Sequence, residues 1–93
     1  MFRLVVTYEM KPGMKKSFLD EVFASGIPGY TLREKGCIGY EFFSACEGEK
    51  AVLLEKWESG EHLDAHREQP HFKVLSALKE KYVENTVIEK YEC

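Results

Sequence analysis

Cysteine is scarce in this chain of 93 residues, which has only Cys37, Cys46 and Cys93. The number is odd and no pair has Cys-x-x-Cys spacing, so neither a disulfide framework nor a zinc knuckle is indicated. No sequence signal marks any of them as an activated nucleophile. We therefore interpret all three as free thiols without a catalytic role.

Long apolar runs and blocks of positive charge are also missing. No stretch reaches the roughly 18 to 20 apolar residues that a membrane-spanning helix needs, and the N-terminus starts with a strand pattern rather than a signal peptide's apolar core. The formal net charge of -3 is spread along the chain, without a basic stripe or a polybasic patch. The sequence predicts a cytoplasmic protein whose partners are neither nucleic acid nor a membrane.

Motifs for common cofactors are absent as well. There is no glycine-rich phosphate loop, no nucleophile elbow, and no flavin, nicotinamide or haem motif, so the sequence predicts no cofactor. Aromatic residues, by contrast, make up 13% of the chain. One thin core does not need so many, and some are expected to line a cavity or a subunit interface.

The spacing of apolar residues predicts strands over 1–10, 37–46, 51–57 and 86–92, and helices over 14–24, 61–67 and 70–83. Gly26-Ile27-Pro28-Gly29 is expected to break the first helix, because Pro28 disfavours helical geometry at the residue before it. Gly36 is expected to close a short turn that follows. Ser59 should cap the next helix, Pro70 should begin the last one and Asn85 should end it.

This order of elements predicts an α+β fold of the ferredoxin-like split βαβ type, formed by a single domain over residues 1–93. Its antiparallel four-stranded sheet has helices on one face. The strands nevertheless carry apolar residues on both faces, as Val52 and Leu54 do opposite Leu53 and Trp57. The second face is therefore expected to be covered by another subunit in a homodimer, with the last strand helping to join the two.

The only tryptophan and all three histidines lie between Glu55 and Phe72. His66 is one helical turn from Leu63, so it should face the sheet, where a neutral imidazole can take a proton from an acidic hydroxyl or a carbon acid. His66 is therefore the candidate catalytic residue. The alternative, which the residues leave open, is that it only bonds to a backbone carbonyl near Pro70.

Six further residues are candidates for contact with a substrate: Tyr40, Phe42, Trp57, His62, His71 and Phe72. Simple packing or capping remains an alternative for Trp57 and His71. His62 and His66 are four residues apart on one helix, as two metal ligands would be, with His71 as a possible third. Pro70 separates this third histidine from the others at an unknown angle, so the sequence predicts no metal site.

The stretch from Trp57 to Phe72, WESGEHLDAHREQPHF, resembles the antibiotic biosynthesis monooxygenase domain family. The shared residues are a strand tryptophan, a serine two residues later, an Ala-His pair and a Pro-His-Phe run. Lys11-Pro12-Gly13 and the segment Glu34 to Glu41 also match, so the resemblance extends over nearly the whole chain. It implies a dimeric α/β barrel of ferredoxin-like subunits, with a ligand cavity in each subunit between sheet and helices.

For function, the resemblance implies a small homodimeric oxidoreductase. The expected activity is that of a cofactor-independent monooxygenase, which oxidises a phenolic or quinol-like aromatic substrate with molecular oxygen after His66 assists its deprotonation. One alternative is an isomerase of a small phosphorylated or keto-sugar signal molecule, because the Gly26 to Gly36 connection resembles that branch of the family. The other is a ligand-binding barrel without chemistry, since a shared fold does not choose among these functions.

Overall fold

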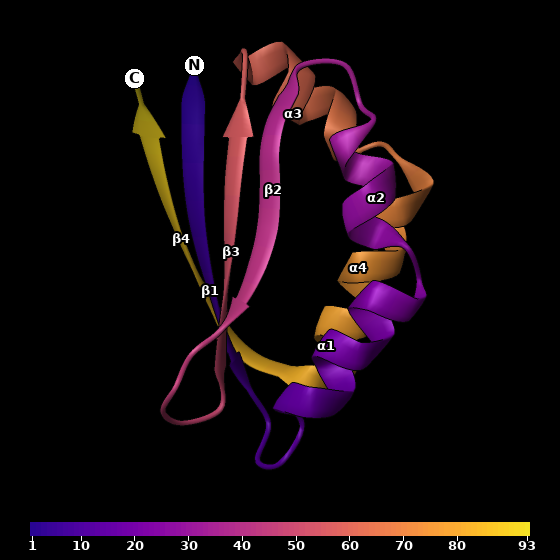
Figure 1. The fold of residues 1–93 in the computed structure, drawn as a ribbon, viewed down its shortest axis with the longest axis vertical. Coiled ribbons are helices and arrows are strands. Elements are labelled where there is room, and N and C mark those ends of the chain that lie inside the picture. Colours follow the sequence, from indigo (N-terminus) through magenta and orange to yellow (C-terminus); the bar gives the residue numbers. More distant parts are fainter.

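A computed structural model describes all residues from 1 to 93. Its elements are β1 (Phe2–Met10), α1 (Lys15–Ala24), α2 (Ile27–Leu32), β2 (Cys37–Ser44), β3 (Lys50–Trp57), α3 (Gly60–His66), α4 (Pro70–Tyr82) and β4 (Val83–Glu92). The strands form one sheet in the order β2-β3-β1-β4, and each neighbouring pair is antiparallel (Figure 1). This topology confirms the predicted α+β, ferredoxin-like fold.

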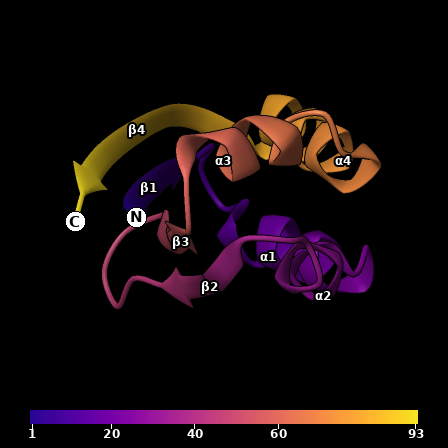
Figure 2. The ribbon, with the colours of Figure 1, turned by 90° about the horizontal axis from the view of Figure 1, so that it is seen from above.

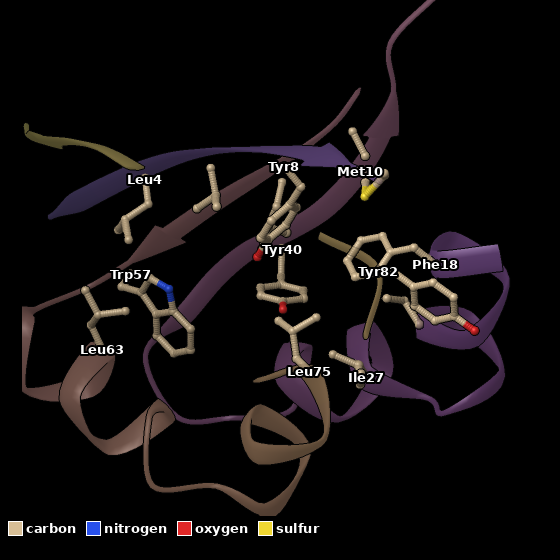
Figure 3. Close-up of a cluster of buried hydrophobic side chains, with 14 residues drawn as sticks. Leu4, Tyr8, Met10, Phe18, Ile27, Tyr40, Trp57, Leu63, Leu75 and Tyr82 are labelled. Atoms are coloured by element: carbon tan, nitrogen blue, oxygen red, sulfur yellow. The ribbon is translucent and has the colours of Figure 1, made fainter. Parts of the chain in front are cut away.

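All four helices lie against one face of the sheet (Figure 2). The core fills the space between them, because alternate strand residues such as Leu4, Val6 and Tyr8 of β1 point toward the helices and are buried. Trp57 at the end of β3 and Phe18 of α1 have no exposed surface (Figure 3). No helix of this fold has both the length and the apolar character needed to cross a membrane.

Three of the predicted local signals are present in the structure. The Ser59 side chain accepts a hydrogen bond from the backbone N–H of His62 at 3.3 Å and so caps α3. Pro70 is in the first turn of α4, where its missing N–H costs no helical hydrogen bond. Gly36 has a φ of +84°, and a Cβ there would collide with the His62 ring. Glycine is therefore required at this turn on two counts.

The chain between α1 and β2 differs from the prediction. A helix already begins at Ile27, with Pro28 in its first turn, and runs to Leu32. Proline is tolerated there because the first turn needs no donor, so the break falls on Gly26 alone, whose φ is +74°. The expected break over four residues is therefore wrong. Helix α2 occupies Ile27 to Gly29 of the expected break and the first part of the short turn that was expected to follow it.

The prediction for the start of β4 is also wrong. Helix α4 ends at Tyr82 and β4 begins at Val83 with no turn between them, so Asn85 lies inside the strand and does not end the helix. Val83 already pairs with Met10 of β1, and the Tyr82 carbonyl accepts from the N–H of Lys11 at 2.8 Å. Because of these contacts with β1, strand β4 begins earlier in the chain than the local sequence pattern indicates.

The face of the sheet that no helix covers carries apolar side chains from several strands. Phe43, Val52, Thr7 and Val87 form one row across all four strands, in register. In the neighbouring row, Leu54 lies beside Val5. Phe43, Leu54 and Val87 are 39 to 47% exposed. The strands are therefore apolar on both faces, as the sequence predicted.

Candidate functional site

A cavity of about 80 Å³ lies between the sheet and helices α3 and α4. Most of its wall is apolar, with Leu4, Leu63 and Leu75 among the lining residues (Figure 3). Four buried side chains in the wall can ionise, namely Tyr8, Tyr40, Glu55 and His66. Small-molecule sites usually measure about 300 to 1,000 Å³, so a ring-shaped ligand requires rim side chains to move outward.

His66 is the last residue of α3 and is 98% buried, with only 2% of its surface exposed. Its ring packs against Trp57, Phe72 and Tyr40, at centroid distances of 4.8, 5.2 and 5.9 Å. Helical spacing from Leu63, which is also buried, places His66 on the inner side of α3 as expected. These aromatic contacts on several sides fix the orientation of the imidazole.

A carboxylate joins His66 to a second histidine. Oε2 of Glu34 lies 2.6 Å from Nδ1 of His66 and 2.7 Å from Nε2 of His71. A carboxylate oxygen accepts, so both imidazole nitrogens donate to it. Nδ1 of a neutral His66 then carries the hydrogen, and Nε2, which no protein group contacts through a hydrogen bond, is left as a base. The alternative bond to a backbone carbonyl is therefore wrong for the His66 side chain.

Glu34 is the site residue that the sequence interpretation missed. It lies in the short connection between α2 and β2 and is separated from its partners by 32 and 37 positions in the chain. The segment Glu34 to Glu41 supported the family resemblance, but nothing in its local pattern assigned chemistry to the glutamate. Only the tertiary fold, which packs the α2–β2 connection against α3 and α4, brings the three side chains together.

Glu55 is a second missed residue. It is 7% exposed on the inner face of β3, and its Oε1 accepts a hydrogen bond from Nε1 of Trp57 at 3.0 Å. Burial raises the pKa of Glu55 above its usual value, and this bond and the nearby His66 oppose the rise only in part. Strict alternation with Leu53 and Trp57 was the signal that could have placed this carboxyl inside.

The two tyrosines of the cavity stay neutral. Burial, and then the charge of Glu55, raises the pKa of Tyr8 and that of Tyr40 well above the usual range for a phenol. Cys37 behaves in the same way, since burial raises the pKa of its thiol to about 11. Of the ionisable groups around the cavity, His66 is the one with a nitrogen left free to accept a proton.

The structure divides the predicted substrate-contact residues into two groups. Tyr40 and Phe72 line the cavity together with His66. Phe42 packs edge-on against Tyr40 at 5.6 Å without lining the cavity, and Trp57 packs against His66. His62 does not line the cavity, and its Nδ1 is 2.7 Å from the Ser59 hydroxyl.

His71 lies on the other side of Glu34, where its ring stacks on Tyr30 at 5.8 Å. It lines an open surface depression rather than the inner cavity. Of the three histidines predicted to surround one site, only His66 therefore reaches the cavity. His62 and His71 both line the surface depression, and Glu34 links His71 to His66.

Replacing Glu55 by glutamine should stabilise the protein at pH 7. The raised pKa means that the folded state holds this proton more tightly than the unfolded chain does, so the free energy of unfolding decreases as the pH rises past the unfolded value. Glutamine keeps an acceptor for Trp57 but cannot ionise. Thermal melts followed by circular dichroism should show a higher Tm by several degrees at pH 7.

The pH dependence of the Tm difference distinguishes removal of a buried charge from improved packing. Below about pH 4, Glu55 is protonated in both states, and the advantage of Glu55→Gln should disappear there. A Tm difference that stays constant between acidic and neutral pH would show that the buried charge is not its origin.

The fold and the site together define a class of protein: a ferredoxin-like domain with a buried histidine–carboxylate pair beside a cavity between its sheet and its helices. Residues 1–78 match the family described as antibiotic biosynthesis monooxygenase. The chain belongs to this family. The resemblance on which the sequence interpretation depended is thereby confirmed.

One similar sequence supports this family, and similar solved structures support the fold. The chain is 32% identical to an Escherichia coli (strain K12) protein named "Probable quinol monooxygenase YgiN", and the match covers 82% of both chains. Among solved structures, PA3566 from Pseudomonas aeruginosa superposes with a TM-score of 0.88 at 22% identity, covering 99% of this chain and 92% of that one. A conserved protein from Methanosarcina mazei Go1 gives 0.86 at 29% identity, covering 98% and 90%.

Proposed function

We propose that this protein is a cofactor-independent monooxygenase that oxidises a phenolic or quinol-like small molecule with molecular oxygen. The observation that supports this best is the position of His66, which lines the cavity while Glu34 bonds to its Nδ1 at 2.6 Å. Membership of the monooxygenase family and the similarity to a protein named as a quinol monooxygenase support the class of reaction.

The geometry suits removal of a proton from an aromatic hydroxyl. A substrate hydroxyl in the cavity would donate to Nε2 of His66, which takes the proton as the anion forms. The Glu34 carboxylate orients the ring and stabilises the imidazolium that results, in the way a buried carboxylate supports a catalytic histidine. The electron-rich anion can then reduce dioxygen directly, with one oxygen atom going to the product and the other to water.

The rest of the cavity suits a flat aromatic ligand, whereas the Glu55 carboxyl in its wall, when charged, opposes an anion. Its wall is mostly apolar, and Tyr40 and Phe72 offer aromatic surfaces. Arg67 and Lys79 contribute positive charge to the same wall. A nearby cation lowers the energy of an anionic ligand relative to the neutral one, so these two side chains would assist the ionisation that His66 carries out.

We also propose that two copies associate through the uncovered face of the sheet. The row of Phe43, Val52, Thr7 and Val87 would then be buried against the same row of a second subunit. A twofold arrangement requires such a self-complementary patch, and an exposed apolar patch of this kind marks an interaction site. Each subunit keeps its own cavity on the opposite, helix-covered face of its sheet.

Oxygen uptake tests the proposed reaction. Protein freed of metal by a chelator is supplied with a panel of quinols and anthrone-like phenols, and uptake that depends on protein and substrate is the expected result. An isomerase needs no oxygen, so turnover of a phosphorylated keto-sugar under anaerobic conditions would contradict the proposal. Tight binding of the panel compounds without any uptake would indicate a ligand-binding barrel instead.

A further inference from the structure

Glu34, His66 and His71 form a cluster of metal-ligating groups that the proposed reaction does not fully use. One ligand atom from each side chain can be chosen so that all three lie within 4.8 Å of one another. The three side chains are only 12, 3 and 13% exposed. Two imidazole nitrogens and one carboxylate oxygen thus converge on a single, nearly buried point.

We propose that this cluster binds a divalent transition-metal ion of the zinc type in place of the two shared hydrogens. Two histidines and one glutamate form a donor set that zinc accepts in proteins, with a fourth position left for water. The sequence offered His62, His66 and His71 as possible ligands, and no metal was predicted because Pro70 separates His71 from the other two at an unknown angle. In the structure the His62 ring bonds to Ser59 instead, and Glu34 is the third potential ligand beside His66 and His71.

An ion requires the three ligand atoms to rearrange. Tetrahedral bonds of 2.0 to 2.1 Å place neighbouring ligand atoms about 3.3 Å apart. The Glu34 oxygen lies 2.6 and 2.7 Å from the two imidazole nitrogens, so each of these separations has to widen by about 0.6 to 0.7 Å. The three ligand atoms lie within 4.8 Å of one another, so the two nitrogens have to approach each other by up to about 1.5 Å. Glu34 lies in the connection between α2 and β2 rather than inside a helix or strand, and a shift of its side chain together with that of His71 supplies this movement.

The surroundings provide both support for the ligands and a route for the ion. Aromatic rings orient both histidines, with Trp57 against His66 and Tyr30 stacked on His71. A surface depression of about 520 Å³ is lined by Glu34 and His71 and opens the cluster to solvent. Arg33 and Lys35 also line this depression, so affinity must come from the three ligands and not from the local field.

A bound ion would switch off His66 as a base. When Nδ1 of a neutral imidazole bonds to a metal, the ring hydrogen moves to Nε2, and the nitrogen proposed to accept the substrate proton becomes a donor. Metal binding and proton abstraction therefore exclude each other. The expectation that zinc inhibits oxygen uptake rests on the proposed function. The expectation that zinc binds the cluster does not.

Direct titration with zinc tests the site without any substrate. The exposed Cys46 and Cys93 are first replaced by serine, because free thiols bind zinc as well. Competition with a chromophoric chelator should then give one zinc ion per chain. Glu34→Gln and His71→Ala should each weaken binding at least tenfold. His62 is on the same helix as His66 and lines the depression, but it is not one of the three ligands, so His62→Ala should leave binding unchanged.

The single tryptophan gives a second readout. Trp57 lies 4.8 Å from the His66 ring, so paramagnetic Co²⁺ in the site should quench its fluorescence, and excess Zn²⁺ should restore it. Absence of stoichiometric zinc binding would overturn the proposal. Equal zinc affinity in folded Glu34→Gln, which conserves the shape of the side chain, would overturn it too, because the ion would then be held elsewhere.

Discussion

Replacing His66 by glutamine should lower the rate of oxygen uptake about 10²- to 10⁴-fold with any quinol that the wild-type protein oxidises. Glutamine occupies a similar volume within the Trp57, Phe72 and Tyr40 contacts but cannot take up a proton. His66 takes up the proton only as the substrate anion forms, so its loss should lower kcat and kcat/KM by similar factors. Steady-state kinetics with an oxygen electrode, on chelator-treated protein, measure both.

Two further variants show which part of the histidine site carries the effect. Glu34→Gln removes the charge that stabilises the imidazolium while conserving shape, so it should also reduce kcat, with KM little changed. His62→Ala is the matched control, because its ring bonds to Ser59 and does not line the cavity. If His66→Gln kept wild-type kinetics while remaining folded, proton abstraction by this residue would be ruled out.

Much of the fold could be predicted because its signals are local. Residues 1–10 alternate with period two, and β1 spans Phe2–Met10 with each second residue from Leu4 onward buried. Ser59 and Pro70 identify helix starts through the chemistry of the first turn, which depends on only a few neighbouring residues. His66 could be placed on the inner side of its helix for the same reason, since its distance from Leu63 is one turn.

The errors occur where distant contacts decide the conformation. Val83 joins the sheet because Met10 of β1 pairs with it, and the α4–β4 boundary follows from that pairing rather than from Asn85. The pairing of Glu34 with His66 and His71 depends on the packing of three elements, over separations of 32 and 37 residues. A histidine motif can thus be found from spacing, whereas the carboxylate that orients it cannot.

Replacing Leu54 by glutamate should convert the proposed homodimer into monomers. Leu54 points to the uncovered side of the sheet, is 39% exposed, and lies in register between Glu41 of β2 and Val5 of β1. A stable interface of about 1,200 to 2,000 Å² would bury this position. An unpaired carboxylate buried there costs several kcal/mol, and twofold symmetry introduces two of them.

Light scattering coupled to gel filtration at micromolar concentration measures the result. The wild-type protein should have the mass of a dimer and the Leu54→Glu variant that of a monomer, with a lower Tm because folding and association are linked. Leu32→Glu is the matched control: Leu32 is 51% exposed but belongs to α2, on the helical side of the molecule, so this variant should stay dimeric. A dimeric Leu54→Glu protein would place the interface elsewhere. A monomeric wild-type protein would leave the apolar second face of the sheet without the explanation that a partner subunit gives it.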